Sequence, residues 1–335
     1  MATLSVQNPT LMDLAKATDP DGGIADIVEI LNETNEVLDD MTWIEGNLTT
    51  GNRTSIRTGL PTPTWRKMYG GVQPDKGSQA QVDDTCGMLE AYAEVDKALA
   101  DLSNNTAAFR MVEEKAHLEG LNQEIVDTLF YGNEDSEPEA FTGFSPRFND
   151  LSADNADNII AGGGSGSDNA SIWLVVWSPQ TCFGIIPKGS VAGLQRSDLG
   201  EVTIEDASDG SNTGRMQAYR THYRWDAGLC VRDWRYVVRI ANIDKSNLTK
   251  DASSSSADLP DLMFQAMTQI PNLSLGRAAW YMSRNTMSFV RRQCTAATSS
   301  STLTIDNVGG KMVTNFSGIP LRRCDSLSAD EALVS

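Results

Sequence analysis

The sequence predicts an α+β protein, because one very long helix is followed by a run of short strands and does not alternate with them. The predicted helix, at about 104–131, contains no proline and begins at Ser103, Asn104 and Asn105, which are all good N-cap types. A helix of this length is about 40 Å long, at about 1.5 Å per residue, and is far longer than the usual globular helix.

The segments after this helix have the patterns of strands and short helices. Strands are predicted at the continuous apolar run Ile172–Trp177 and at Glu201–Glu205, Gln217–Trp225 and Trp234–Ala241. Apolar residues at helical spacing predict a short helix from Pro260 to Ile270 and a second from Asn285 to Cys294. Leu303–Leu327 again has strand character, with Gly309 and Gly310 as the turn.

Composition narrows the class of protein. The chain has 335 residues, of which 40% are hydrophobic, and a formal net charge of -18, which suits a soluble protein of about two domains. Its longest apolar run, Ile172–Trp177, is far shorter than the roughly 20 residues of a membrane span, so no contact with a membrane is expected. The five cysteines are widely spaced and odd in number, which favours neither a disulfide framework nor a zinc site.

The segment Ile24–Asp40 is predicted to be an amphipathic helix with one apolar and one acidic side. It lies near the N-terminus, before any core has formed, so its apolar side is expected to dock on another surface. The apolar residues of this predicted docking face are Ile24, Ile27, Val28, Leu31 and Leu38.

Residues Gly46–Gln81 are rich in Gly, Thr, Pro and basic side chains and predict a protruding hairpin loop, with strand-like pieces at Arg53–Thr58 and Trp65–Tyr69. A disordered insertion is the alternative. The segment 1–45 carries ten acids and one lysine, net -9, whereas 46–77 carries five basic residues and one acid, net +4. Adjacent segments of opposite charge suggest contact between copies of the chain.

The long helix is predicted to have two apolar stripes on nearly opposite sides, so that its N-terminal half would be covered twice and its C-terminal half once. Gly120 lies where one stripe ends. A glycine there fits a close crossing of another element, a place where the helix can bend, or a tolerated surface position. One stripe consists of Met111, Leu118, Leu121, Ile125 and Leu129, and the other of Phe109, Val112 and Ala116.

No motif in the chain indicates catalysis. There are two histidines, His117 and His222, and no metal-binding histidine motif, nucleophile elbow, phosphate-binding loop or dinucleotide fingerprint occurs. Carboxylates are plentiful, so spacing alone leaves an acid-base pair open. We expect no catalytic residues, no metal and no cofactor. The acidic balance also argues against general binding to nucleic-acid phosphates.

Several stretches in order along the chain resemble the major capsid proteins of tailed double-stranded DNA phages, which have the Hong Kong 97 fold, and most closely those of short-tailed podoviruses. The stretches that carry the resemblance are Gly120–Asn133 (GLNQEIVDTLFYGN), Phe141–Asn149 (FTGFSPRFN), Phe183–Ser190 (FGIIPKGS), Asp198–Glu201 (DLGE) and Trp225–Asp233 (WDAGLCVRD).

The resemblance implies a division of the chain into the parts of that fold. The spine helix, at about 104–131, would belong to the peripheral domain. The implied parts are an N-terminal arm (1–45), an extended loop with its return strand (46–96), the peripheral domain (97–148), an axial domain (149–298) and a return to the peripheral domain (299–335).

The resemblance also implies self-assembly as hexamers and pentamers into an icosahedral head shell around the phage genome. Partners would be a separate scaffolding protein, a portal protein and a decoration protein. The shell would enclose double-stranded DNA without sequence-specific binding, assemble in the bacterial cytoplasm, and close without covalent cross-links, since no Lys, Asn and Glu set matches the family's chain-mail. An encapsulin-like compartment and another virion protein are the alternatives.

Two hypotheses follow for particular residues. Gly120 would let the spine bend while the shell expands. The basic loop would lie over an acidic strip of a neighbour, either its arm or its spine near Glu113 and Glu114. The loop residues of this predicted contact are Arg53, Arg57, Trp65, Arg66 and Lys67.

Overall fold

A computed structural model describes residues 33, 35–102, 105–206, 214–250, 256–296, 303–308 and 311–335. The predicted docking residues Ile24, Ile27, Val28 and Leu31 and the predicted turn at Gly309 and Gly310 lie outside these ranges. The chain divides into two compact units. Unit 1 contains Glu33, Met88–Val126 and Val191–Asp226, and unit 2 contains Asn35–Gly87, Asp127–Ser190 and Ala227–Ser335.

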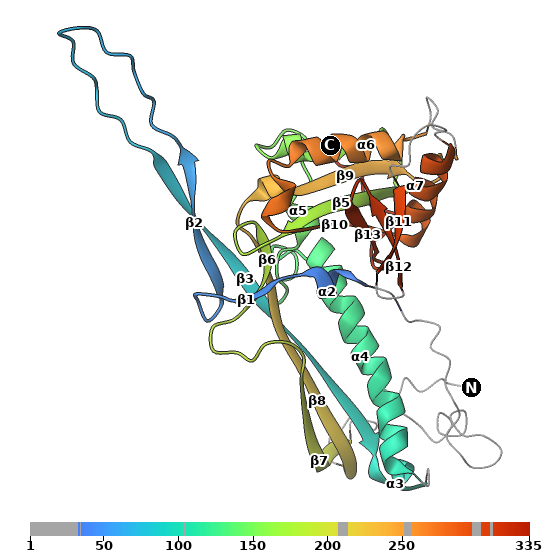
Figure 1. Ribbon diagram of the computed structural model, residues 1–335. Helices are drawn as coiled ribbons and strands as arrows, with labels where there is room; N and C mark the ends of the chain where they lie inside the picture. The colour runs from blue at the N-terminus through green and yellow to red at the C-terminus, as the bar shows by residue number, and fades with distance from the viewer. Residues whose placement is uncertain are drawn as a thin grey trace. The chain divides into compact units, whose positions relative to one another are not determined.

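The predicted α+β class is confirmed, with strands and helices along the whole described chain (Figure 1). The strands are β1 (Trp43–Glu45), β2 (Gly51–Gly59), β3 (Ser78–Asp96), β4 (Ile159–Ala161), β5 (Asn169–Trp177), β6 (Cys182–Ile186), β7 (Gln195–Asp206), β8 (Gly214–Val231), β9 (Val237–Asp244), β10 (Arg277–Met282), β11 (Leu303–Val308), β12 (Lys311–Phe316) and β13 (Ile319–Arg323). The helices are α2 (Val37–Asp40), α3 (Lys97–Leu102), α4 (Thr106–Tyr131), α5 (Phe144–Arg147), α6 (Leu259–Gln269) and α7 (Arg284–Ala296), with short 3-10 turns η1 (Ala156–Asn158), η2 (Trp234–Tyr236) and η3 (Leu273–Leu275).

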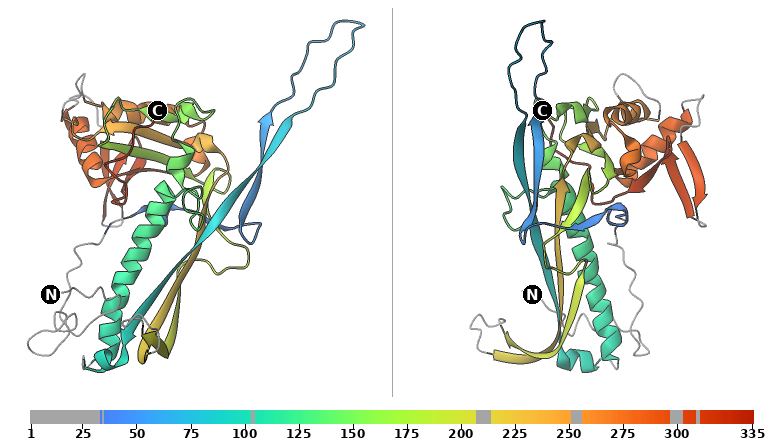
Figure 2. Two further views of the ribbon diagram at one scale, coloured as in Figure 1. Left: turned by 180° about the vertical axis from the view of Figure 1, so that it is seen from behind. Right: turned by 60° about the vertical axis from the view of Figure 1, so that its left-hand side comes forward.

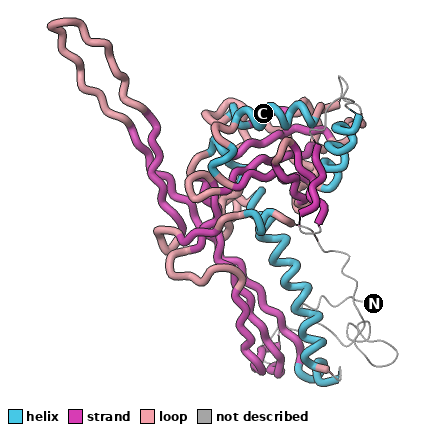
Figure 3. Tube along the Cα trace, in the orientation of Figure 1, coloured by secondary structure: helices cyan, strands magenta, loops and turns pink. Residues whose placement is uncertain are grey.

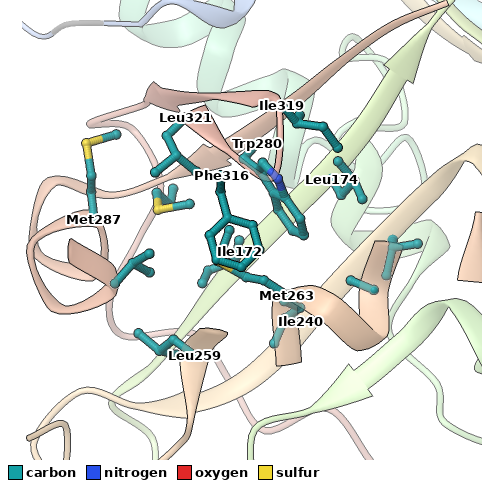
Figure 4. Close-up of a cluster of buried hydrophobic side chains, with 14 of the residues drawn as sticks. Ile172, Leu174, Ile240, Leu259, Met263, Trp280, Met287, Phe316, Ile319 and Leu321 are labelled. Atoms are coloured by element: carbon teal, nitrogen blue, oxygen red, sulfur yellow. The ribbon is translucent and has the colours of Figure 1, made fainter. Parts of the chain in front are cut away.

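The core of unit 2 is built on β5, whose residues are all buried. β5 pairs antiparallel with β9 on one side and β10 on the other. Because side chains alternate along a strand, β5 supplies two cores. Ile172, Leu174 and Val176 join one apolar cluster with residues of α6 and α7, in which Trp280 meets Phe316 edge-on at 6.2 Å (Figure 4).

The opposite face of β5 carries aromatic residues. Trp173 lies 6.0 Å from Phe130 at the end of α4 and 5.7 Å from Phe144 of α5, measured between ring centroids. Phe144 also meets Trp177 edge-on at 5.9 Å. Tilted and edge-on pairs at these distances are favoured by the ring quadrupoles. The motif FTGFSPRFN therefore acts as a core-forming segment of unit 2.

Unit 1 is organised around the antiparallel pair of β7 and β8, which lie side by side in both views of Figure 2. Their register shifts between Asp198 and Gly200, and Gly200 has a φ of +68°, a conformation that glycine adopts easily. Two small apolar clusters fill the unit. They consist of Val95, Leu99, Ala100 and Phe109, and of Ala93, Leu121 and Tyr223.

The predicted long helix is confirmed as α4, Thr106–Tyr131. The side chain of Asn105 accepts a hydrogen bond from the Ala108 N–H at 3.2 Å, as an N-cap should. Leu121, Ile125 and Leu129 are buried, as is Phe109. Met111 and Leu118 are 62% and 37% exposed, so the described chain leaves one predicted stripe of the N-terminal half open, and its covering stays a prediction.

No helix in the described ranges is long and apolar enough to cross a membrane. The same residues contain no cluster of three or more His, Cys, Asp or Glu side chains suited to a metal ion.

Candidate functional site

The hairpin of β2 and β3 presents the loop Leu60–Gly77, which has no regular structure (Figure 3). Its two strands pair antiparallel, from Gly51 opposite Thr85 to Arg57 opposite Gln79. The predicted strand Arg53–Thr58 is confirmed within β2. The predicted strand at Trp65–Tyr69 is wrong, because no described strand pairs with this segment and its backbone groups therefore have no ladder to join.

The loop makes almost no packing contact with its own chain. Every residue from 60 to 79 is exposed except Gly70, which is intermediate. The relative exposures of Trp65, Met68 and Tyr69 are 102%, 91% and 101%, and Leu60 reaches 77%. A contiguous exposed patch of large apolar side chains usually marks an interaction surface. We name Leu60–Gly77 the hairpin tip.

Basic residues of the hairpin differ in what they contact. Arg53 donates two hydrogen bonds of 2.6 Å to Asp83, and this pairing raises the pKa of Arg53. Arg66 donates from Nε to the Gly70 carbonyl at 2.8 Å. Arg57 and Lys67 are exposed, and no ion pair with another described residue involves Arg57, Arg66 or Lys67. The Arg53 guanidinium is thus paired within the chain, whereas the charged groups of Arg57, Arg66 and Lys67 are accessible to another molecule.

The root of the hairpin is held by buried polar side chains. Asn52 and Thr54 of β2 are buried and share a hydrogen bond of 3.1 Å. Asp84 of β3, also buried, accepts from Arg147 at 2.7 Å. Burial, and then the charge of Asp84, raise the pKa of the Cys230 thiol to about 12, so this sulfur stays protonated. These buried hydrogen bonds and the Asp84–Arg147 ion pair hold the strands of the root together.

Gly228 of β8 completes the root. A Cβ at this position would lie 2.6 Å from the carbonyl oxygen of Thr85 and 2.9 Å from the Ile185 side chain. The strands β3, β6 and β8 therefore approach too closely here for any other residue. The root is therefore tightly packed, and the motif WDAGLCVRD contributes Gly228 to it.

The acidic residues predicted as partners of the hairpin lie elsewhere in the chain. Glu114 is 8% exposed and accepts hydrogen bonds from Thr221 at 2.7 Å, Tyr223 at 2.9 Å and Arg196 at 2.8 Å. Burial raises the pKa of Glu114, but these three donors together outweigh it and lower the pKa. Glu114 is therefore committed to β7 and β8 of its own unit, a correction to its predicted role. Glu113 is half-buried and also has an interaction within the chain.

The end of the N-terminal arm is fixed to unit 2 by a buried carboxylate that sequence patterns did not reveal. In α2, Asp40 is buried and accepts from Arg322 at 2.8 and 3.0 Å, from Arg277 at 2.6 Å and from Tyr281 at 3.2 Å. Leu38, one of the predicted docking residues, is half-buried beside it. The predicted helix Ile24–Asp40 is helical only at Val37–Asp40 within the described residues.

Gly120 faces open space in this chain, with no described atom within 4 Å of a Cβ built there. A close crossing by another element of the chain is therefore excluded among the described residues. A bend and a tolerated surface position both remain compatible with the structure.

Comparisons with known proteins identify the family. The model of the family "Major capsid protein GP7" matches residues 19–335. The structure of bacteriophage Epsilon15 has a chain with 40% identity and a TM-score of 0.77, with 100% of both chains covered. The bacteriophage JBD30 capsid has 10% identity and a TM-score of 0.47, with 97% of both chains covered. No curated protein matches the chain.

Both compact units of the chain and its exposed hairpin thus lie within the match to a chain of bacteriophage Epsilon15. The match to bacteriophage Epsilon15 spans the entire chain and supports the predicted Hong Kong 97-like architecture. The family match likewise spans the arm's second half, the hairpin, α4 and the strands of both units. The chain therefore belongs to the GP7 family of major capsid proteins, which form the head shells of tailed double-stranded DNA phages.

Proposed function

We propose that copies of this chain close the head shell by laying the hairpin tip on a neighbouring copy, without covalent cross-links. The observation that carries the proposal is the near-complete exposure of Trp65, Met68 and Tyr69 on a hairpin whose root is held by buried side chains. Burying an aromatic or methionine side chain stabilises an interface by about 1.5–3 kcal/mol. Aromatic, Met and Arg residues are also the types enriched in interface cores.

The surface that receives the tip is proposed to be acidic. Arg66 and Lys67 are neighbours of Trp65 in the sequence, Arg57 is exposed on β2 of the same hairpin, and the chain as a whole has a net charge of -18. The N-terminal 45 residues alone have a net charge of -9. A neighbour's arm therefore suits the basic tip better than the spine at Glu114, which is buried in its own unit.

Further partners complete the proposed assembly. The arm, extended loop, peripheral domain, axial domain and return segment would divide the chain at the boundaries given by the family resemblance. A separate scaffolding protein would take part in assembly in the host cytoplasm, and a portal protein and a decoration or cement protein would be further partners of the shell. The shell of this acidic chain would enclose the double-stranded DNA genome without sequence-specific binding.

Charge reversal of the hairpin tests the ionic part of the contact. The variant Arg57→Glu/Arg66→Glu is expected to assemble with a lower yield and a weaker response to salt, because attraction to an acidic neighbour becomes repulsion. The measurement is shell yield by sedimentation between low and high salt. A matched control, Lys188→Glu/Lys250→Glu, makes the same charge change at exposed positions elsewhere. Equal yields and salt responses in wild type and hairpin variant would refute an ionic contribution.

Gly120→Ala tests the proposed bend of the spine. Because space around Gly120 is open, the variant is expected to fold and to stabilise α4 by about 1 kcal/mol. A stiffer spine should slow shell expansion, measured as the change of particle diameter with time in electron micrographs. Gly200→Ala is not a suitable control because its φ is +68°, so Ala107→Gly, at an exposed position of α4, serves as the reverse substitution. Normal expansion of Gly120→Ala would mean that Gly120 is a tolerated surface residue.

A further inference from the structure

Helix α4 exposes a stripe of its surface within unit 1. Met111 and Leu118 are 62% and 37% exposed, and Ala107 and Lys115 between and beside them are exposed as well. Spacings of three and four residues place all four side chains on one face. We name these four residues the α4 stripe. Single exposed apolar residues are ordinary, but two large ones aligned on a helix surface indicate a docking face.

The N-terminal arm enters the described chain beside this stripe. The backbone N–H of Glu33 donates to Oε1 of Glu119 at 2.9 Å, and the bond is partly buried. The same oxygen accepts from Nε2 of Gln123 at 3.0 Å, which orients the carboxylate. Glu119 directly follows Leu118 of the stripe. The residues just before Glu33 therefore start at the level of Leu118 on α4.

We propose that the segment Ile24–Leu31 of the same chain forms a helix that covers the α4 stripe. The spacing agrees. Ile24 and Leu31 are seven residues apart, as are Met111 and Leu118, so each pair spans about 10 Å along a helix. With Glu33 at Glu119, a parallel arrangement places Leu31 at Leu118 and Ile24 at Met111.

The tether at Glu33 and the pattern of the arm support the same occupant. Ile27 and Val28 share the apolar face with Ile24 and Leu31, while Asp26 and Glu29 lie on the opposite face. Docking of the apolar face on Met111 and Leu118 therefore leaves both acids in solvent. The tether at Glu33 keeps the local concentration of the arm high beside the stripe.

The proposal goes beyond shell formation and does not depend on it, because it is tested in unassembled protein. Amide hydrogen exchange of the full-length chain is compared for wild type and for Met111→Asp/Leu118→Asp. Wild type should show slow exchange in residues 24–31, and the variant should exchange there at least 10-fold faster, since packing on the stripe is what protects these amides. Peptides from β5 and β9, in the core of unit 2, should be unchanged.

Two further variants separate this contact from general damage. Ala116→Asp places the same charge at an exposed position on another face of α4, and it should leave protection of residues 24–31 as in wild type. Ile27→Asp should produce the same loss in the arm and also speed exchange of the α4 segment 107–119.

The outcomes are distinct. Unprotected amides at 24–31 in wild type would overturn the proposal, as would protection that survives Met111→Asp/Leu118→Asp. Protection that disappears on dilution would show that a second copy covers the stripe, which would also overturn the assignment to the same chain. If shell formation were lost while residues 24–31 stayed protected, the result would count against the proposed shell contact and not against the docking of the arm.

Discussion

Replacing Glu331 by alanine is expected to reduce the free energy of unfolding by about 3–5 kcal/mol, because it leaves a buried guanidinium without its counter-charge. Glu331 and Arg239 are both buried, with 2.7 Å between Oε2 and Nη2. The measurement is urea unfolding of the unassembled protein. Asp330→Ala removes the neighbouring carboxylate, whose pair with Lys245 is largely exposed, and should cost at most about 1 kcal/mol.

The size of the Glu331 effect follows from the other groups that converge on it. Tyr131 donates to Oε1 of Glu331 at 2.6 Å, and Ser171 donates to Oε2. Burial, and then the charge of Glu331, raise the pKa of Tyr131, so the phenol remains a donor. Arg239 also donates to the Phe148 carbonyl at 2.7 Å. The C-terminal segment thereby binds to β5 and β9.

A double variant distinguishes an unpaired charge from lost packing. Arg239→Met/Glu331→Leu removes both charges at once, and it should be less destabilised than Glu331→Ala because no buried charge is left alone. If the double variant were as unstable as the single one, the loss would come from the hydrogen bonds to Tyr131, Ser171 and Phe148 and not from the ion pair.

The second large effect concerns assembly. Trp65→Ser/Tyr69→Ser is expected to leave folding unchanged, since both side chains are fully exposed in the chain. If each contributes about 2 kcal/mol at the interface, the protein concentration needed for assembly should rise at least about 100-fold, at 1.4 kcal/mol for each factor of ten. Light scattering at a series of concentrations measures this threshold.

The matched control for that variant lies on the same hairpin. Gln79→Ser/Gln81→Ser shortens two exposed polar side chains of β3 without removing apolar surface, and it should assemble as wild type does. Urea midpoints of all three proteins should agree. A threshold for Trp65→Ser/Tyr69→Ser equal to that of the control would show that the aromatic side chains remain in solvent.

Local sequence patterns predicted the helices and strands whose conformation is determined by residues within the segment itself. The helix α4 followed from an uninterrupted run with an N-cap, and β5 followed from a continuous apolar run in which both faces are buried. Pro260 marked the first turn of α6, where Asp258 caps the helix. These signals act over one or two turns, so a single segment contains them.

Local patterns of this kind could not predict contacts between segments that are far apart in the sequence. Glu114 looked like one of several surface acids, yet the register of β7 against β8 brings Arg196, Thr221 and Tyr223 to it. Arg239 in the apolar run of β9 and Glu331 near the C-terminus are 92 residues apart. The arginine within a buried strand was the available signal, since a buried charge requires a partner, but the sequence could not name that partner.

The hairpin shows the opposite error, in which a local pattern predicted a strand that does not form. Trp65–Tyr69 has residues that favour strands, but a strand needs a partner, and none pairs with this segment among the described residues. Its apolar side chains pack on nothing within one chain, and this exposure adds to the charge pattern that had already marked the loop as a candidate interface. Arg57, Arg66 and Lys67 are exposed and their contact with a neighbour stays a prediction, while Arg53 is paired with Asp83.

The most direct test is a cryo-electron microscopy reconstruction of shells assembled from the full-length protein. We predict that Trp65, Met68 and Tyr69 of each copy lie buried against a neighbouring copy, with Arg57, Arg66 or Lys67 within salt-bridge distance of that neighbour's carboxylates. Shells in which these side chains remain exposed to solvent would contradict the proposed role of the hairpin tip.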